Sequence, residues 1–206
     1  KIAKMKALTE AILSVSRDDV PTAGLLQGHG ELTETALAPF ITVLQKNGLN
    51  VETVNLLGGQ SLEGVDLLLL ACPQKDWTDG ETETIRAFTQ NGGSLLALRD
   101  YTDPIAGLPN YFSLLRNYGV IPLDGVVVAG KEDTSNYYGE QLYLLPYLCE
   151  LDMTLPLIMG NFDVLLMPAA SAFETPGEAD SGLSAATLLK TGPHAYLRNL
   201  ADGVDS

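Results

Sequence analysis

The run from Val65 to Ala71, with the sequence VDLLLLA, constrains the fold of this chain more than any other feature. It is almost continuously apolar, and Pro73 ends it. Strands buried on both faces of a parallel sheet have such sequences, because helices cover the sheet on both sides. The run therefore predicts a central strand of an α/β fold.

Strand–helix–strand patterns surround this run. Residues 22–26 and 51–56 predict strands, and apolar residues at helical spacing between them predict a helix from about Leu37 to Leu44. Pro39 falls inside that pattern, and we expect it in the first turn, where a proline lacks no hydrogen bond. Gly48 is a helix stop signal.

A second helix follows the central run. Thr78 and Glu81 have the spacing of a capping box, Ile85 and Phe88 supply an apolar face, and residues 94–98 predict a further buried strand. Two such units in succession predict an α/β fold with an open, mostly parallel, doubly wound sheet.

The pattern is less regular beyond Asp100. Residues 110–118 predict a short helix, 125–129 a strand, 131–146 a long excursion, 164–167 and 185–190 later strands, and 174–182 a loop. Residues 2–15 have an apolar stripe that predicts a first helix. We expect a single α/β domain over 1–206. Residues 22–130 would form its core, and 131–206 an irregular extension that returns strands to the sheet.

The charge balance is strongly acidic. The chain has 12 Lys and Arg against 26 Asp and Glu, a net charge of −14. Such a field repels phosphate backbones, so we expect no nucleic-acid partner. No apolar run approaches the ~20 residues that span a bilayer. The chain begins at Lys1 within a helical pattern, so we expect it to be part of a longer protein.

The loop Gly28-His29-Gly30-Glu31 is the first candidate site. It follows the first predicted strand, at the carboxyl edge where open α/β sheets bind ligands. Its backbone N–H groups and His29 could hold a polar or anionic ligand, or the glycines could serve a tight turn alone. The loop has neither the third glycine of a dinucleotide fingerprint nor the Lys-Ser/Thr of a phosphate loop.

Cys72 ends the central strand, and His29 and Glu31 could approach it across the same edge. That would be a Cys–His–acid arrangement for acyl transfer. Against this reading, a nucleophile elbow needs small neighbours, and Pro73 removes the N–H that usually serves the oxyanion. We therefore predict no catalytic residues. We also expect no disulfide framework, because Cys72 and Cys149 are the sole cysteines and lie among apolar neighbours.

Asp100 follows the fourth predicted strand and is a further ligand-binding candidate at this edge. Asp100 and Asp103 near a histidine could bind a cation, but the chain has two histidines without i, i+4 pairing, so we predict no metal and no cofactor. Tyr137, Tyr138 and Tyr143 could stack on a sugar or a partner, or fold onto their own domain.

In order and spacing, several segments resemble the auxiliary domain of ABC-type uncharacterized transport systems, the gliding-motility GldG-like proteins. They are Leu8-Thr9-Glu10, the Gly28–Glu31 loop, residues 66–73, Asn91-Gly92-Gly93-Ser94-Leu95-Leu96 and Leu188-Leu189-Lys190-Thr191-Gly192. The resemblance extends from about Leu8 to about Tyr196. Cys72 stands where the family commonly has glycine, and Gly192 where it commonly has serine.

This resemblance implies a fold similar to the class-I glutamine-amidotransferase-like, flavodoxin-like three-layer sandwich, without its catalytic cysteine. It also implies an extracytoplasmic domain at the cell membrane, anchored by segments absent from this chain. The expected partners are the permease and ATPase subunits of an ABC transporter, with a glycan or small polar ligand at the sheet edge by analogy.

Three hypotheses follow. The first is a non-catalytic binding or assembly domain of a transporter accessory protein. The second is a cysteine hydrolase or amidotransferase-like enzyme that uses Cys72, His29 and Glu31. The third is a carbohydrate-binding module that uses the Gly28–Glu31 loop and the tyrosines.

Overall fold

The computed structural model describes residues 20–102, 105–162, 164–174 and 185–199. The predicted helix at 2–15, Asp103 and most of the loop at 174–182 lie outside the described residues. The chain divides into two compact units, residues 1–99 and 100–206, which are described separately. The expectation of a single domain stays a prediction.

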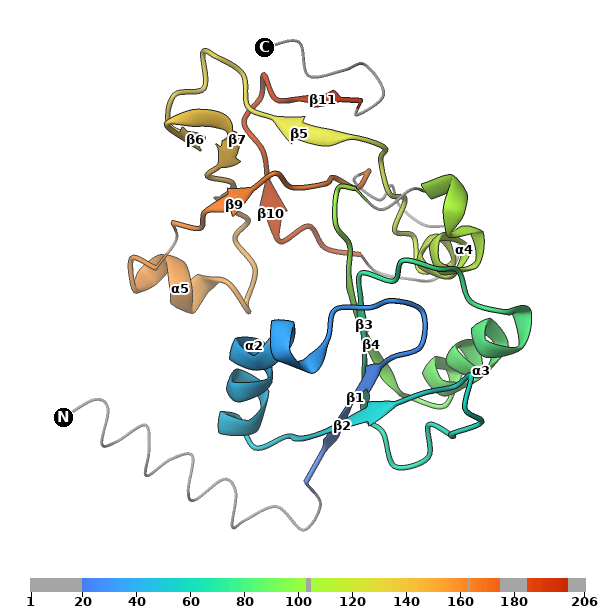
Figure 1. Cartoon of the computed structure of the whole chain (residues 1–206). Helices are drawn as coiled ribbons and strands as arrows, with labels where there is room; N and C mark the ends of the chain where they lie inside the picture. Colours follow the sequence, from blue (N-terminus) through green and yellow to red (C-terminus); the bar gives the residue numbers. More distant parts are fainter. Residues whose placement is uncertain (1–19, 103–104, 163, 175–184, 200–206) are drawn as a thin grey trace, which may run out of the picture. The chain divides into compact units, whose positions relative to one another are not determined.

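The first unit is built on a four-stranded parallel sheet with the strand order β2-β1-β3-β4. The strands are β1 (Thr22–Leu26), β2 (Asn50–Val54), β3 (Leu67–Ala71) and β4 (Ser94–Leu98). Helix α2 (Glu34–Lys46) connects β1 to β2, and α3 (Asp79–Gln90) connects β3 to β4. Figure 1 shows the two helices on opposite faces of the sheet. The prediction of an α/β fold with a parallel sheet is confirmed.

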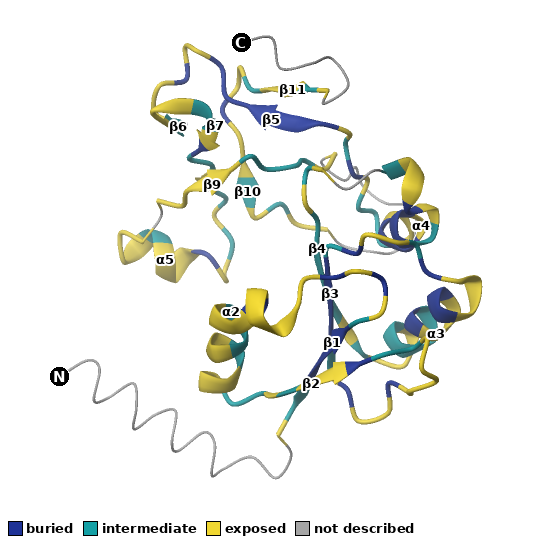
Figure 2. Cartoon of the chain, viewed as in Figure 1, coloured by how far each residue is buried: buried dark blue, intermediate teal, exposed yellow. Residues whose placement is uncertain are grey.

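The centre of this sheet is buried on both faces, as Figure 2 shows for β1 and β3. On the face covered by α2, Leu25, Leu69 and Ala71 form a cluster with Leu37 of the helix. In the central strand, Leu68 and Leu70 are also fully buried. Side chains alternate between faces along a strand, so both faces of β3 need apolar residues. This explains the continuous apolar run.

Two sequence-based expectations in this unit are wrong. Strand β4 was expected to be buried, but it is half-exposed because it is an edge strand of this sheet. Pro39 was expected in the first turn of its helix. Thr33 caps α2 instead, so the helix begins a turn earlier and Pro39 lies inside it on the exposed side.

The second unit contains short elements in small antiparallel sheets, β11 with β5, β6-β7-β9, and β10 with β8. Its elements are η1 (Ile105–Gly107), α4 (Pro109–Asn117), β5 (Val126–Val128), β6 (Tyr137–Tyr138), β7 (Glu140–Leu144), β8 (Tyr147–Leu148), α5 (Leu155–Met159), β9 (Met167–Pro168), β10 (Leu189–Lys190) and β11 (Tyr196–Arg198).

A cluster of Val127, Ala129 and Leu144, with Tyr137 packed against it, forms part of the core of this unit. The predicted helix at 110–118 and strand at 125–129 are present. The predicted excursion at 131–146 is wrong in part, since it contains β6 and β7. Gly139, at φ 72°, permits the tight turn between them, and tyrosines favour strands.

Candidate functional site

The loop after β1 lies at the carboxyl edge of the sheet, between β1 and β3, where the strand order reverses. This is the switch point at which doubly wound sheets bind ligands. Gly28 has φ 129° and Gly30 has φ 78°, so both use conformations that other residues rarely adopt. A Cβ on Gly30 would come within 3.0 Å of Cβ of Gln74. Gly30 therefore serves the close approach of the loops after β1 and β3, whereas a Cβ on Gly28 would meet Asn55 and Leu57, which follow β2.

The loops after β1 and β3 are joined by backbone hydrogen bonds. The carbonyl of His29 accepts from the N–H groups of Gln74 and Lys75, at 2.8 and 2.9 Å. The N–H of Leu32 donates to the carbonyl of Ala71 at 2.9 Å. The predicted proximity of the Gly28–Glu31 and Cys72 segments at one edge is thus present.

The His29 ring lies between two carboxylates. Its Nδ1 is 3.6 Å from Oε1 of Glu31, and its Nε2 is 3.3 Å from Oε2 of Glu81. All three residues are buried, with 4 to 7 % of their surface exposed. The backbone N–H of His29 also donates to Oε2 of Glu31 at 2.7 Å. His29, Glu31 and Glu81 are called the buried acid–histidine cluster below.

Glu81 belongs to helix α3 and was not among the predicted site residues. Its Oε2 accepts from the N–H and the hydroxyl of Thr78, which completes the predicted capping box. The same oxygen faces Nε2 of His29. The sequence signals the capping role alone, because only the tertiary fold brings α3 to the loop after β1.

Cys72 occupies an unusual backbone position. Its φ is 54°, in the left-handed region that a residue with a Cβ adopts at a cost. Its N–H donates to the carbonyl of Leu98, and buried Pro73 follows it. Helix α3 begins at Asp79, so no helix follows the cysteine directly. Neither Cys72 nor Cys149 forms a disulfide.

The predicted ligand-binding residues differ in accessibility. Gly28 and Gly30 are exposed, whereas His29 and Glu31 are buried and contact other residues of the protein. Asp100 belongs to the second unit, where its Oδ1 accepts from the N–H and hydroxyl of Thr102 at 2.9 and 2.7 Å. The ligand-binding role of these residues stays a prediction. Within the described ranges, no group of three or more His, Cys, Asp or Glu could hold a metal ion.

A second polar cluster, in the second unit, was missed by sequence reasoning. Asp133 accepts the backbone N–H of His194 at 2.9 Å and lies 2.8 Å from the ring Nδ1. The hydroxyl of Tyr147 donates to Oδ1 of Asn136 at 2.9 Å. A Cβ on Gly192 would lie 2.5 Å from Oδ2 of Asp133 and 2.7 Å from Oδ1 of Asn136, so this position has no room for a side chain.

The pKa values of the Asp133–His194 pair reflect this geometry. The hydrogen bond to the His194 ring holds the pKa of Asp133 below its usual value. The same hydrogen bond and the Asp133 charge raise the pKa of His194. The partners are 61 residues apart, so no local motif could have revealed the pair.

The tyrosines have different environments. Tyr137 packs against the core of the second unit, whereas Tyr138, Tyr143 and Tyr147 are exposed.

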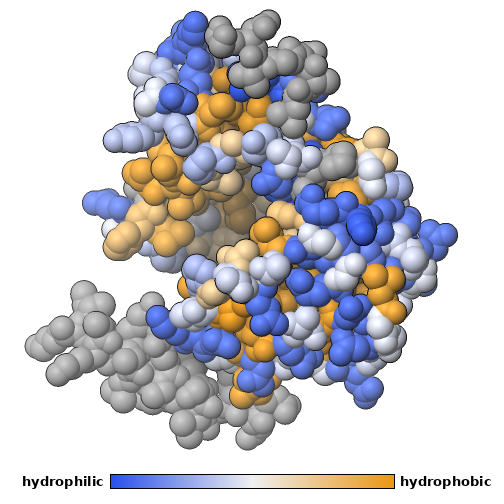
Figure 3. All heavy atoms as spheres, viewed as in Figure 1, coloured by the Kyte–Doolittle hydropathy of each residue, from blue (hydrophilic) through white to orange (hydrophobic). Residues whose placement is uncertain are grey.

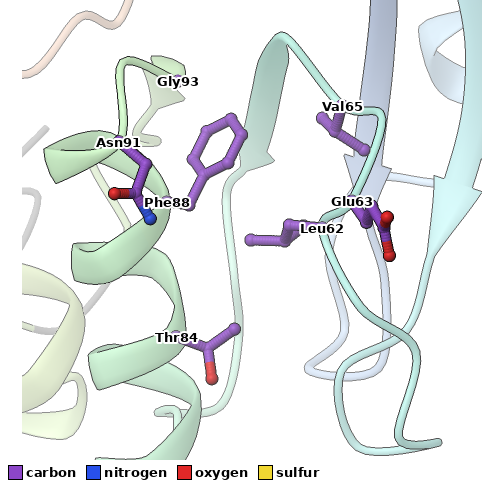
Figure 4. Close-up of a pocket in the computed structure, with 7 residues that line it drawn as sticks. All are labelled: Leu62, Glu63, Val65, Thr84, Phe88, Asn91 and Gly93. Carbon is purple, nitrogen blue, oxygen red and sulfur yellow. The ribbon is translucent and has the colours of Figure 1, made fainter.

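A small cavity of about 320 Å³ lies between α3 and residues 62–65 of the first unit (Figure 4). Leu62 points toward α3 there, and the Glu63 carboxylate points away. The Phe88 ring lies directly over Gly93, where a Cβ would clash.

A family model described as an ABC-type uncharacterized transport system matches residues 20–205. The chain therefore belongs to this family of auxiliary components of ABC-type transport. A solved structure called "mmIFT52 N-terminal domain" is similar in fold, with a TM-score of 0.63 at 16% identity, over 86% of this chain and 76% of that chain. A comparison with curated proteins finds no match. Among the described residues, no helix is both long and apolar enough to span a membrane.

Proposed function

We propose that this chain is a non-catalytic, extracytoplasmic domain of a GldG-like accessory protein. Its role is binding or assembly within an ABC-type transport system at the cell membrane. The family match over residues 20–205 supports the accessory role. The permease and ATPase subunits are the proposed partners, reached through the full-length, membrane-anchored protein.

The observation that carries the non-catalytic role is the position of the His29 ring. Both ring nitrogens face carboxylates, Nδ1 toward Glu31 and Nε2 toward Glu81. A Cys–His pair needs one nitrogen directed at the thiol and the other at the orienting acid. His29 has an acid on each side and is therefore placed to join a loop to α3.

The left-handed backbone of Cys72 at the end of β3 supports a degenerate amidotransferase-like fold. In α/β hydrolases the nucleophile occupies a strained turn that leads into a helix. Here the strained residue remains, but Pro73 follows it and α3 begins at Asp79. The turn has the geometry of an elbow without the helix that would complete one.

Thiol alkylation tests the non-catalytic role. Iodoacetamide is applied near neutral pH to Cys149→Ala, which leaves Cys72 as the reporter, and to the converse variant Cys72→Ala. We expect Cys72 to react no faster than an ordinary cysteine thiol, because both nitrogens of the His29 ring face carboxylates. Faster alkylation of Cys72 that His29→Gln abolishes would establish the enzyme hypothesis instead.

The assembly role is tested in the full-length protein. A tagged form is purified from membranes with the permease and ATPase encoded beside it, and reporter fusions show the side of the membrane on which the domain lies. We expect both subunits to co-purify and the domain to be extracytoplasmic. Co-purification of neither subunit, or a cytoplasmic domain, contradicts the proposal.

Exposed Tyr138, Tyr143 and Tyr147 favour carbohydrate binding as a second candidate, because sugars stack on aromatic rings. A glycan array tests it. Binding that Tyr138→Ala weakens would support it, since Tyr138 is exposed. Absence of binding to any glycan would reject this candidate.

A further inference from the structure

An exposed apolar ridge extends through α5 to the start of β9 in the second unit. Figure 3 shows apolar side chains gathered there, and Figure 2 shows their exposure. Met159, Val164 and Phe162 are 83, 76 and 72 % exposed. The ridge consists of Met153, Leu157, Met159, Phe162, Val164 and Leu166. Contiguous apolar surface of this kind commonly marks an interaction site.

The backbone holds this ridge in a defined conformation. The hydroxyl of Thr154 accepts from the N–H of Leu151 at 2.9 Å, just before α5. After α5, the N–H of Phe162 donates to the carbonyl of Leu157 at 2.9 Å. A Cβ on Gly160 would lie 2.9 Å from the Phe162 ring, so the ring folds over the glycine. The exposed side chains are therefore displayed by a hydrogen-bonded turn.

A cavity of about 630 Å³ lies within the second unit, and its lining includes the residue that follows the ridge in the chain. Met167 follows the last ridge residue and lines this cavity together with Leu144, Pro146 and Leu189. A cavity of this volume can receive an anchoring apolar side chain, and such anchors contribute most to protein–protein affinity. The ridge and the cavity together therefore form a surface suited to bind another protein.

The charged residues that flank the ridge in the sequence are all acidic. No lysine, arginine or histidine occurs between Lys131 and Lys190, whereas the same stretch has acidic residues on both sides of the ridge. Glu150, Asp152 and Glu174 are exposed there. The next basic residue along the chain is Lys190, which lines the cavity.

This charge pattern distinguishes among three occupants. An anionic bilayer surface would be repelled by the carboxylates. A second copy would bring the same carboxylates to the interface, and like charges facing each other across an interface are unfavourable. A partner surface with lysine or arginine beside an apolar strip would be attracted by the carboxylates and would also bury the apolar ridge.

We propose that the ridge and its cavity bind an amphipathic segment of a partner protein, with an apolar face and basic side chains along its edges. This inference rests on the proposed assembly function and deepens it by naming the chemistry of the partner. The apolar side chains supply affinity, and the acidic border selects the basic partner.

The probe is a labelled amphipathic peptide of leucine and lysine, with a leucine and glutamate peptide of the same pattern as control. Binding to the whole chain is followed by fluorescence anisotropy. We expect the lysine peptide to bind and the glutamate peptide not to bind. The double variant Met159→Gln/Phe162→Gln should weaken binding about tenfold or more, because two apolar contacts are lost without any change in charge.

Matched variants in the first unit separate this site from general attraction to an acidic protein. Val43→Gln/Leu57→Gln changes two apolar residues that are more than half exposed and should leave binding unchanged. Glu150→Lys/Asp152→Lys should weaken binding more than Glu52→Lys/Glu63→Lys, which alters the net charge equally. Circular dichroism confirms that each variant is folded.

The proposal would be overturned if the ridge Gln variant and its first-unit control weakened peptide binding equally. It would also be overturned if the two charge-reversal variants did so. Binding to anionic vesicles that the ridge variant abolishes, or a dimer in sedimentation that the same variant dissociates, would overturn it too. Those results would assign the ridge to lipid or to a second copy. If the permease and ATPase co-purify but the lysine peptide does not bind, the assembly function stands and this inference fails.

Discussion

At the scale of single residues, His29 is held between carboxylates from two elements, the loop after β1 and helix α3. We expect His29→Gln to destabilise the protein by about 2 to 3 kcal/mol, because it removes the ring that lies between the two buried carboxylates. Urea unfolding measures this loss.

Glu81→Gln provides the matched test of this pairing. Glutamine can still serve the capping box, but it removes the charge opposite His29. If the pairing is the cause, the loss in the double variant His29→Gln/Glu81→Gln is smaller than the sum of the two single losses. Additive losses, or a change below about 0.5 kcal/mol for His29→Gln, would contradict the pairing.

The strain at Cys72 leads to a second residue-scale prediction. Its φ of 54° favours glycine. We expect Cys72→Gly to stabilise the protein by about 0.5 to 1 kcal/mol, since glycine adopts this backbone without a penalty. Cys72→Ala keeps the Cβ and should bring no such gain. Thermal unfolding of both variants distinguishes release of backbone strain from loss of the thiol, and an equal change in both would exclude strain.

At the scale of elements, the two helices of the first unit have caps of different quality. Thr78 and Glu81 form a complete capping box, whereas Thr33 makes one side-chain bond, to the N–H of Ala36 at 3.3 Å. We expect Thr78→Ala to destabilise the protein by about 1 to 2 kcal/mol and Thr33→Ala by less, because the first loses two hydrogen bonds, both to Glu81. Urea unfolding compares them, and an equal or reversed order would contradict this ranking.

The same elements show what local pattern can predict. The capping box was predicted from residues 78–81 because its partners are three residues apart. The start of α2 was misplaced because helical periodicity identifies the apolar face rather than the first turn. A proline inside the pattern favoured a later start, whereas Thr33 caps the helix before it.

At the scale of the whole molecule, contacts between distant residues introduce pH dependence. The hydrogen bond between Asp133 and His194 lowers the pKa of Asp133 from 3.8 and raises that of His194 from 6.5. The Asp133 contribution to stability is present above pH 3.8 and is lost as pH falls through its lowered pKa. The His194 contribution is present below pH 6.5 and is lost as pH rises through its raised pKa.

The pair therefore stabilises the fold most between these two pH values. We expect the midpoint of thermal unfolding to differ most between wild type and His194→Gln near pH ~5, and less near pH ~8. Thermal scans across this range test it, with Asp133→Asn as the matched partner variant. If the difference in thermal midpoint between wild type and variant stays constant from pH ~5 to ~8, the charges of the pair do not contribute to stability.

The sequence by itself determined the parallel sheet, the helix α3 and the edge at which the Gly28–Glu31 loop lies. Burial on both faces imposes a continuous apolar run, and a capping box needs only neighbours along the chain. Tertiary structure alone decided that Glu81 faces His29, that His194 pairs with Asp133 and that the α5 ridge is exposed. Those contacts depend on where distant elements pack, and a local pattern of residues does not encode that placement.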